Sequence, residues 1–126
     1  MKKPNKKALK NRCWKLMSEY VRRKDADFGG FVECFTCRKR LPWQEAHAGH
    51  YQHNRLDYDL RNLRSQCAGC NTFRGGKLDA YTMRLIDEND VQFVQTLRAD
   101  ADRHLGYTYA ELVEIEKDLK AKLAAL

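Results

Sequence analysis

The sequence lacks any long run of apolar residues, and this absence excludes a membrane-spanning helix. No stretch of the chain approaches the roughly 18 consecutive apolar residues that such a helix requires. The first residues, Met-Lys-Lys-Pro-Asn-Lys-Lys, also lack the apolar segment of a signal peptide, so we expect a cytoplasmic protein with reduced cysteines. Internal repeats, low-complexity tracts and long linkers are absent as well, so we expect one domain over residues 1–126.

Acidic residues are scarce at the N-terminus, where ten Lys and Arg side chains accompany a single acid, Glu19, within residues 1–24. Residues 1–77 carry a net charge of +11, residues 78–126 carry −4, and the whole chain carries +7. This distribution favours a polyanionic partner such as nucleic acid for the N-terminal two-thirds. The acidic remainder is expected to be scaffold or subunit contact. The alternative is that the lysine-rich terminus is only a solubilising tail.

Apolar periodicity predicts an amphipathic helix over about residues 7–25, which forms the basic N-terminal part of the chain, residues 1–24. Trp14 and Trp43 are expected in the core. At the other end, Thr108 and Glu111 have the spacing of a capping box and predict a final helix that runs to Leu123. The remaining expected elements are short strands around a turn over 31–43, a strand over 44–51, a loop over 52–61, a short helix over 68–74, and two helices within 78–89 and 91–97, which belong to a helical C-terminal part, 78–126.

Four of the five cysteines form two Cys-x-x-Cys pairs, Cys34 with Cys37 and Cys67 with Cys70, separated by 29 residues. Two such pairs supply the four thiolates of a tetrahedral zinc shell, which has no open position and is therefore structural. Redox-active cysteine pairs are the alternative, although no thioredoxin-like βαβ pattern accompanies them. Cys13 lies on the apolar face of the first helix and is expected to be a small buried residue.

The segment between the two cysteine pairs concentrates imidazole and amide side chains. His47, His50 and His53 all lie in this segment, Asn62 follows them, and Asn71 comes directly after the last cysteine of the pairs. Three histidines beside a metal frame in a basic protein indicate a functional site more than a set of unrelated surface residues. His53 is expected to be a surface or phosphate-contacting residue.

These features resemble the HNH, or ββα-metal, nuclease finger and, more closely, the phage NinG/Rap family of recombination endonucleases. The layout is also similar to that of endonuclease VII, in which an Asn likewise follows the last zinc cysteine. The resemblance implies an α+β fold in which residues 31–77 form a zinc-stabilised treble-clef finger. The matching segments are Asp25-Ala26-Asp27, Cys34-x-x-Cys37, His47-Ala48-x-His50-Tyr51, Arg61-Asn62-Leu63, Gln66-Cys67-x-x-Cys70-Asn71, Gly76, Tyr81 and the helix over 108–123.

The resemblance also implies a role for each residue of the finger. His50 would be the general base, and Asn62 would orient the loop and His50. His47 and Asn71 would hold a catalytic divalent ion, Mg²⁺ or Mn²⁺, because His47 stands where endonuclease VII has a carboxylate and imidazole suits softer ions. The acids that could add a ligand are Glu45, Asp57 and Asp59.

The implied activity is cleavage of phosphodiester bonds in branched recombination intermediates, such as Holliday junctions or displacement loops, by a phage- or prophage-encoded homodimer in a bacterial cell. Two alternatives remain open: an HNH endonuclease that nicks ordinary duplex, and a non-catalytic zinc module that binds DNA. The expected phosphate contacts are Arg38, Arg40, Arg74 and Lys77.

Overall fold

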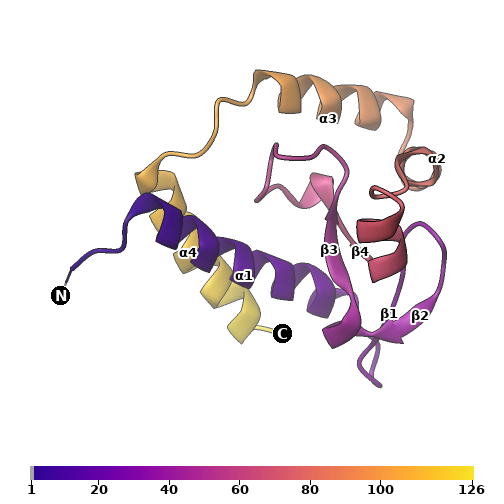
Figure 1. Ribbon diagram of the computed structural model, residues 1–126, viewed down its shortest axis with the longest axis horizontal. Coiled ribbons are helices and arrows are strands. Elements are labelled where there is room, and N and C mark those ends of the chain that lie inside the picture. Colours follow the sequence, from indigo (N-terminus) through magenta and orange to yellow (C-terminus); the bar gives the residue numbers. More distant parts are fainter. Residues whose placement is uncertain (1) are drawn as a thin grey trace.

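The computed structural model describes residues 2–126 and confirms the expected α+β class (Figure 1). Four helices surround two separate two-stranded antiparallel sheets. In chain order the elements are α1 (Lys6–Lys24), β1 (Phe31–Glu33), β2 (Arg40–Pro42), the turn η1 (Trp43–Glu45), β3 (His47–His50), the turn η2 (Leu60–Asn62), β4 (Leu63–Gln66), the π-helical turn η3 (Gly69–Phe73), α2 (Leu78–Glu88), α3 (Val91–Arg103) and α4 (Tyr109–Ala124).

The N-terminal helix α1 begins at an Asn cap and buries one apolar stripe. The side chain of Asn5 accepts a hydrogen bond from the Ala8 N–H at 2.8 Å, which satisfies one of the free donors at the helix start. Leu9, Cys13, Met17 and Val21 recur every four residues and are all buried, as their spacing predicts. The Cys13 thiol donates to the Leu112 carbonyl at 3.2 Å, so Cys13 is the core residue expected from the sequence.

The last helix, α4, packs along α1, so the first and last helices of the chain lie side by side (Figure 1). Thr108 and Glu111 form the predicted capping box, with hydrogen bonds in both directions. Leu112 packs against Leu9 and Cys13, and Leu119 packs against the next turns of α1. Arg12 makes two hydrogen bonds to the Glu116 carboxylate, at 2.7 and 2.8 Å, at the edge of this contact.

The β3–β4 hairpin lies between α1 and α2. Its register pairs His47 with Gln66 and His50 with Leu63. Ala48 and Leu63 share a buried cluster with α1 and α4, whereas Tyr81 of α2 donates its hydroxyl to the Gly49 carbonyl at 2.9 Å. The hairpin is therefore held between the α1–α4 pair on one side and α2 on the other.

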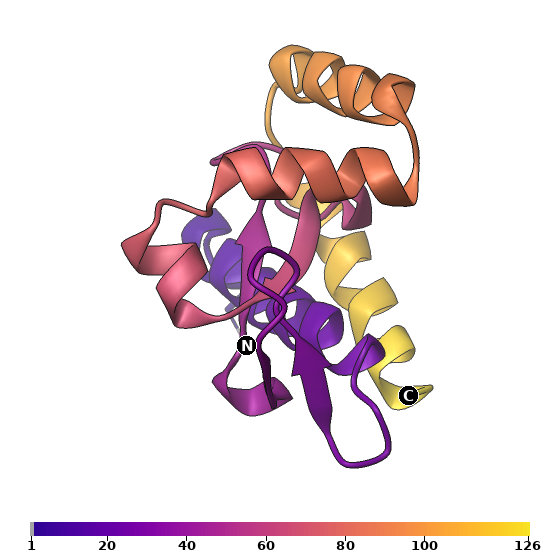
Figure 2. The ribbon, with the colours of Figure 1, turned by 90° about the vertical axis from the view of Figure 1, so that its right-hand side faces the viewer.

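The second half of the molecule is a helical layer formed by α2 and α3, which lie against each other at one end of the molecule (Figure 2). The loop after β3 packs under this layer through Tyr51 and Leu56, which join a cluster with Val94 and Leu97 of α3. The β1–β2 hairpin lies at the opposite end in the same view. No helix within residues 2–126 is long and apolar enough to cross a membrane.

The structure differs from the expected elements in three places. The strand expected over 44–51 is confined to His47–His50, because Trp43–Glu45 forms a helical turn after Pro42. Residues 63–66 form β4 by pairing with β3, although no strand is expected there from the sequence. The helix expected over 68–74 is a π-helical turn, Gly69–Phe73, which ends at Gly75 and Gly76 with positive φ angles.

Leu112→Ala should lower the free energy of unfolding by about 3 kcal/mol, because Leu112 is fully buried between α4 and α1 and the substitution leaves a cavity. Urea denaturation followed by circular dichroism measures this loss. Val113→Ala is the matched control, since the neighbouring Val113 is 43% exposed and should change the free energy by less than about 0.5 kcal/mol. Equal effects of the two substitutions would contradict the α1–α4 packing.

Candidate metal centre and the histidines beside it

The four paired cysteines converge on one point between the two hairpins. Cys34 follows β1, Cys37 lies in the turn to β2, Cys67 follows β4, and Cys70 lies in η3. Their sulfur atoms all lie within 4.8 Å of one another, and the Cys37 and Cys67 sulfurs are 3.7 Å apart. Four sulfurs at 2.3 Å from a zinc ion form a tetrahedron with edges of about 3.8 Å, so the cluster fits structural zinc.

Backbone hydrogen bonds shape each cysteine pair for metal binding. In the first pair the Arg38 N–H donates to the Cys34 carbonyl at 3.0 Å, and Arg38 takes a left-handed conformation, with φ of 70°. In the second pair the Cys70 N–H donates to the Cys67 sulfur at 3.4 Å. An N–H group that points at a sulfur stabilises the thiolate form, which is the form that binds metal.

Cys34 and Cys37 differ in how readily their thiols ionise. Burial raises the pKa of Cys34, but hydrogen bonds from Thr36 and from backbone N–H groups outweigh it and lower that pKa to about 6. Burial and the neighbouring sulfurs raise the pKa of Cys37 to about 12. The lowered pKa of Cys34 beside the raised pKa of Cys37 indicates that two neighbouring thiolates would repel each other. A divalent cation between them would remove this repulsion.

His47 and Asn71 are brought together beside the cysteine cluster. The Nδ1 atom of His47, on β3, lies 3.1 Å from the Asn71 amide nitrogen, in η3 next to Cys70. The orientation of the Asn amide follows from its hydrogen bonds, so a rotated amide would present its oxygen at the same place. The pair therefore offers one imidazole nitrogen and one amide oxygen to an ion. Within residues 2–126 the cysteine cluster is the only set of three or more His, Cys, Asp or Glu side chains that could share a metal.

Gly49 lies on the same face of β3 as His47 and has no room for a side chain. Positions 47 and 49 share one face of β3, because side chains alternate along a strand. A Cβ atom at Gly49 would overlap the side-chain amide of the buried Gln66. Gln66 in turn donates to the Gly76 carbonyl at 2.8 Å and to the Thr36 hydroxyl at 3.1 Å, which ties β4 to both neighbouring segments.

His50 leaves the opposite face of β3 and lies against α1. Its ring stacks on Trp14, with ring centroids 4.7 Å apart and an angle of 19° between the planes. Its Nε2 atom lies 2.9 Å from Oδ1 of Asp57, a close polar contact that lacks the alignment of a hydrogen bond. The His50 contact is the main cause of a lowered pKa for Asp57, which is therefore a carboxylate at neutral pH. A hollow of about 250 Å³ opens over this pair.

Two of the neighbours of His50 were not recognised from the sequence. Trp14, which was expected in the core, is only partly buried and forms one wall beside His50. Asp57, which was considered as a metal ligand, contacts His50 instead. The only sequence signal for Asp57 was its acidity within the segment between the cysteine pairs.

Asn62 is fully buried and holds the loop that carries Asp57. Its amide nitrogen donates to the Gln52 carbonyl at 3.1 Å and to the Arg55 carbonyl at 2.8 Å, and its oxygen accepts from the Gln52 N–H at 2.7 Å. Leu56, inside this loop, has an unfavourable positive φ of 48°, so the loop needs such a brace. Asn62 thus acts on His50 only through the loop.

The four expected phosphate contacts fall into two groups. Arg38 pairs with Glu33 at 3.3 Å, and Arg40 pairs with Asp27 at 2.6 Å while lying 4.2 Å above the Phe31 ring. Arg74 and Lys77 follow Asn71 in the chain, and within residues 2–126 their side chains make no ion pair. Arg74 and Lys77 are therefore the more available pair.

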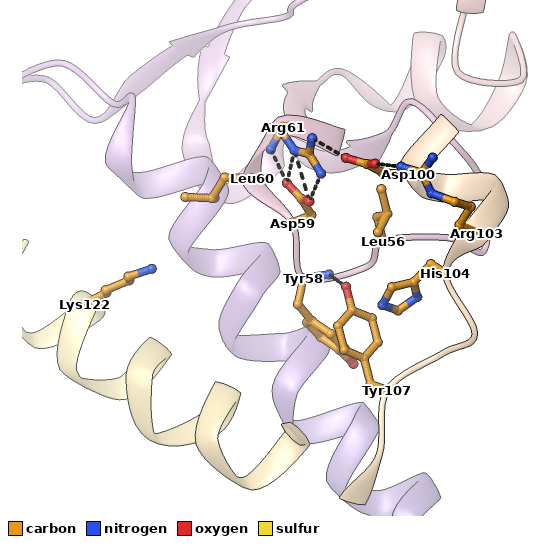
Figure 3. A pocket seen from close by; sticks show the side chains of 10 residues that line it. All are labelled: Leu56, Tyr58, Asp59, Leu60, Arg61, Asp100, Arg103, His104, Tyr107 and Lys122. Atoms are coloured by element: carbon orange, nitrogen blue, oxygen red, sulfur yellow. Dashed lines mark hydrogen bonds and ion pairs between the residues drawn. The ribbon is translucent and has the colours of Figure 1, made fainter. Parts of the chain in front are cut away.

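A larger hollow, with a volume of about 650 Å³, lies elsewhere, between η2, α3 and α4 (Figure 3). Arg61 binds both Asp59, at 2.6 Å, and Asp100, at 2.9 Å, across it. Tyr107 accepts a hydrogen bond from the Tyr58 N–H on one side. Because its central charges neutralise one another, this hollow braces the loop against α3 and indicates no ligand.

Cys70→Ser should reduce bound zinc from one ion per chain to a small fraction and remove the cooperative unfolding transition, because metal binding contributes directly to folding in so small a finger. Elemental analysis of the purified protein and thermal unfolding measure the two effects. Cys13→Ala is the control and should keep its zinc, since Cys13 lies far from the cluster in the α1–α4 core. Unchanged zinc in Cys70→Ser would contradict the metal centre.

Comparisons with known proteins identify relatives over the whole chain. Residues 1–126 match the protein family described as "Bacteriophage Lambda NinG protein". Protein ninG of Salmonella phage P22 is 29% identical, and the alignment covers 98% of this chain and 63% of that protein. Proteins ninG of Escherichia phage lambda and Escherichia phage 933W are each 28% identical, and the alignments cover 98% of this chain and 63% and 64% of those proteins.

The chain thus spans slightly less than two thirds of the length of these relatives. No solved structure matches it. Because the family match extends over the complete sequence and includes both cysteine pairs and the residues between them, the chain belongs to the phage NinG family.

Proposed function

We propose that this protein is a metal-dependent endonuclease that cleaves phosphodiester bonds in branched DNA. The observation that carries the proposal is the position of two histidines on β3. His50 contacts Asp57 of the following loop, and His47 contacts Asn71 of η3. Residues 31–77 would form a treble-clef ββα-metal finger, with β3, β4 and η3 as its two strands and helix. The cysteine cluster supports this assignment, because it joins the end of β4 to the start of η3.

His50 is the proposed general base. The Asp57 carboxylate beside Nε2 favours the tautomer that carries its proton on that nitrogen, and Nδ1 is then free to accept a proton from water. Stacking on Trp14 limits rotation of the ring. Asp57 is thus a proposed positioning residue, and Asn62 supports it through the loop.

His47 and Asn71 are the proposed protein ligands of a catalytic divalent ion. When bound, that ion supplies electrostatic stabilisation of the scissile phosphate and of the leaving oxygen. The donor set contains no carboxylate, which favours Mn²⁺ over Mg²⁺ and leaves most of the coordination shell to water and phosphate. His47 and His50 are three residues apart on β3, so their backbone positions are about 10 Å apart and their side chains leave opposite faces of the strand.

The branched substrate and a homodimeric state complete the proposal. Both follow from the resemblance to recombination endonucleases, because symmetric cutting of a four-way junction requires two active sites. The relatives named above are phage proteins, which fits a phage or prophage protein acting in a bacterial cell. The net charge of +7 supports binding to the phosphate backbone.

The purified protein should nick a four-way junction in the presence of Mn²⁺ or Mg²⁺, and His50→Ala should reduce the cleavage rate at least about 100-fold, because the attacking water loses its base. Cleavage of labelled junction and of linear duplex at matched salt measures both activity and preference. Equal rates on the two substrates would indicate an endonuclease for ordinary duplex. Binding without cleavage by the unmodified protein would indicate a non-catalytic zinc module.

Asp57→Asn should lower kcat roughly tenfold or more while changing KM little, because the carboxylate that orients the His50 ring is lost but no proposed DNA contact is removed. Initial rates over a range of junction concentrations separate the two constants. Asp102→Asn, at an exposed position of α3, is the control for the change in charge. A rise in KM at constant kcat would contradict a positioning role for Asp57.

A further inference from the structure

We infer that Lys7 and Lys10 of α1 form the surface along which the phosphates of one DNA strand approach His50. The inference rests on the proposed function, since it places the DNA relative to the proposed general base. It differs from the sequence-based expectation, in which the phosphate contacts came from the first cysteine pair and from the segment after Asn71. Lys10 lines the hollow over His50, Lys7 lies one helical turn before it, and within residues 2–126 neither side chain makes an ion pair.

Lys7 and Lys10 lie on the face of α1 that leads to His50. The hollow over His50 is lined by α1 on one side and by the loop around Asp57 on the other. Lys10, Asn11 and Trp14 are the residues that α1 contributes to this lining. Lys7 precedes Lys10 by three residues and Asn11 by four, so it lies on the same face one turn earlier. A stripe of α1 therefore continues from the hollow toward the N-terminus of the helix.

The charges of these two lysines are available. Within residues 2–126, Lys7 and Lys10 make no side-chain ion pair, and the same is true of Lys6 and Lys15, whereas three other basic residues of α1 are engaged. Arg12 binds Glu116 of α4, Arg23 binds Glu19, and Lys24 binds Asp25. Of the lysines without an ion pair on α1, Lys10 lines the hollow over His50 and Lys7 lies one turn before it on the same face.

Charge around the hollow also favours an anion at its α1 side. The main cause of the lowered pKa of Asp57 is His50, and the Lys10 charge adds to it, so Lys10 is close enough to the hollow to act on it. Asp57 is already paired with His50 and would be screened from an approaching phosphate. Asn11 and Asn54 add amide donors to the lining.

The spacing of the lysines suits a phosphate backbone. A helix rises 1.5 Å per residue, so Lys7 and Lys10 are separated by about 4.5 Å along α1. Successive phosphates of one DNA strand are about 3.4 Å apart along the duplex axis, a difference that long, flexible lysine side chains can absorb. By contrast, Arg38 and Arg40 are held by Glu33 and Asp27, and their use would require breaking those ion pairs.

The test measures DNA binding separately from cleavage. Lys7→Ala/Lys10→Ala is compared with Lys117→Ala/Lys120→Ala, a control pair on α4 that removes the same charge from exposed positions outside the hollow. All variants carry His50→Ala, so that the DNA stays intact without a chelator that would remove zinc. Fluorescence anisotropy with a labelled four-way junction and with a linear duplex, at 50–200 mM salt, gives the dissociation constants. Alanine preserves the helix at both sites.

Lys7→Ala/Lys10→Ala should weaken binding roughly tenfold at the lowest salt and reduce the slope of log K against log salt by about 1 to 2, because each lost phosphate contact removes about 0.9 from that slope. Lys117→Ala/Lys120→Ala should keep the parental slope, and Lys7→Arg/Lys10→Arg should restore it. An unchanged slope for Lys7→Ala/Lys10→Ala, or an equal loss in the control pair, would overturn the inference. Loss of binding in Lys7→Ala/Lys10→Ala, together with no cleavage of DNA by the protein that keeps His50, would support this surface while refuting the nuclease.

Discussion

The convergence of four cysteine sulfurs is the interaction on which the rest of this structure depends. The strands of both hairpins have only three or four residues, too few to be stable as isolated ribbons. The cluster joins the first hairpin to the end of the second, supported by a hydrogen bond from the Phe35 N–H to the Ser65 carbonyl at 2.9 Å. It also holds η3, and thereby places Asn71 beside His47. A metal ion at this point would stabilise the fold and the candidate site together.

The two faces of β3 separate two chemical tasks. One face presents His47 to Asn71 and leaves no room for a side chain at Gly49. The other face presents His50 to Trp14 and Asp57. In the proposed mechanism the first arrangement would hold the ion and the second would take up a proton. The α1 helix is therefore a wall of the candidate site as well as part of the core.

Ion pairs within the fold neutralise some of the basic side chains, whereas the composition gives only the net charge of the chain. Several arginines are engaged within the fold, as in the Arg12–Glu116, Arg40–Asp27 and Arg61–Asp100 pairs. These exposed or partly exposed pairs contribute little to stability, but they reduce the charge available to a partner. The lysines near the start of α1 keep theirs. The surface that we propose for DNA is thus narrower than the basic two-thirds of the sequence.

The sequence by itself determined the features that depend on local spacing: the apolar stripe of α1, the capping box of α4, the two cysteine pairs and the imidazole-rich segment between them. Each needs only a few neighbouring residues to be recognised. Tertiary structure decided that residues 63–66 form a strand, that Asp57 and Trp14 contact His50, and that Arg40 is engaged by Asp27. These contacts join residues from 7 to 36 positions apart, and no local preference specifies them. They form only when the folded chain brings short, individually unstable elements together.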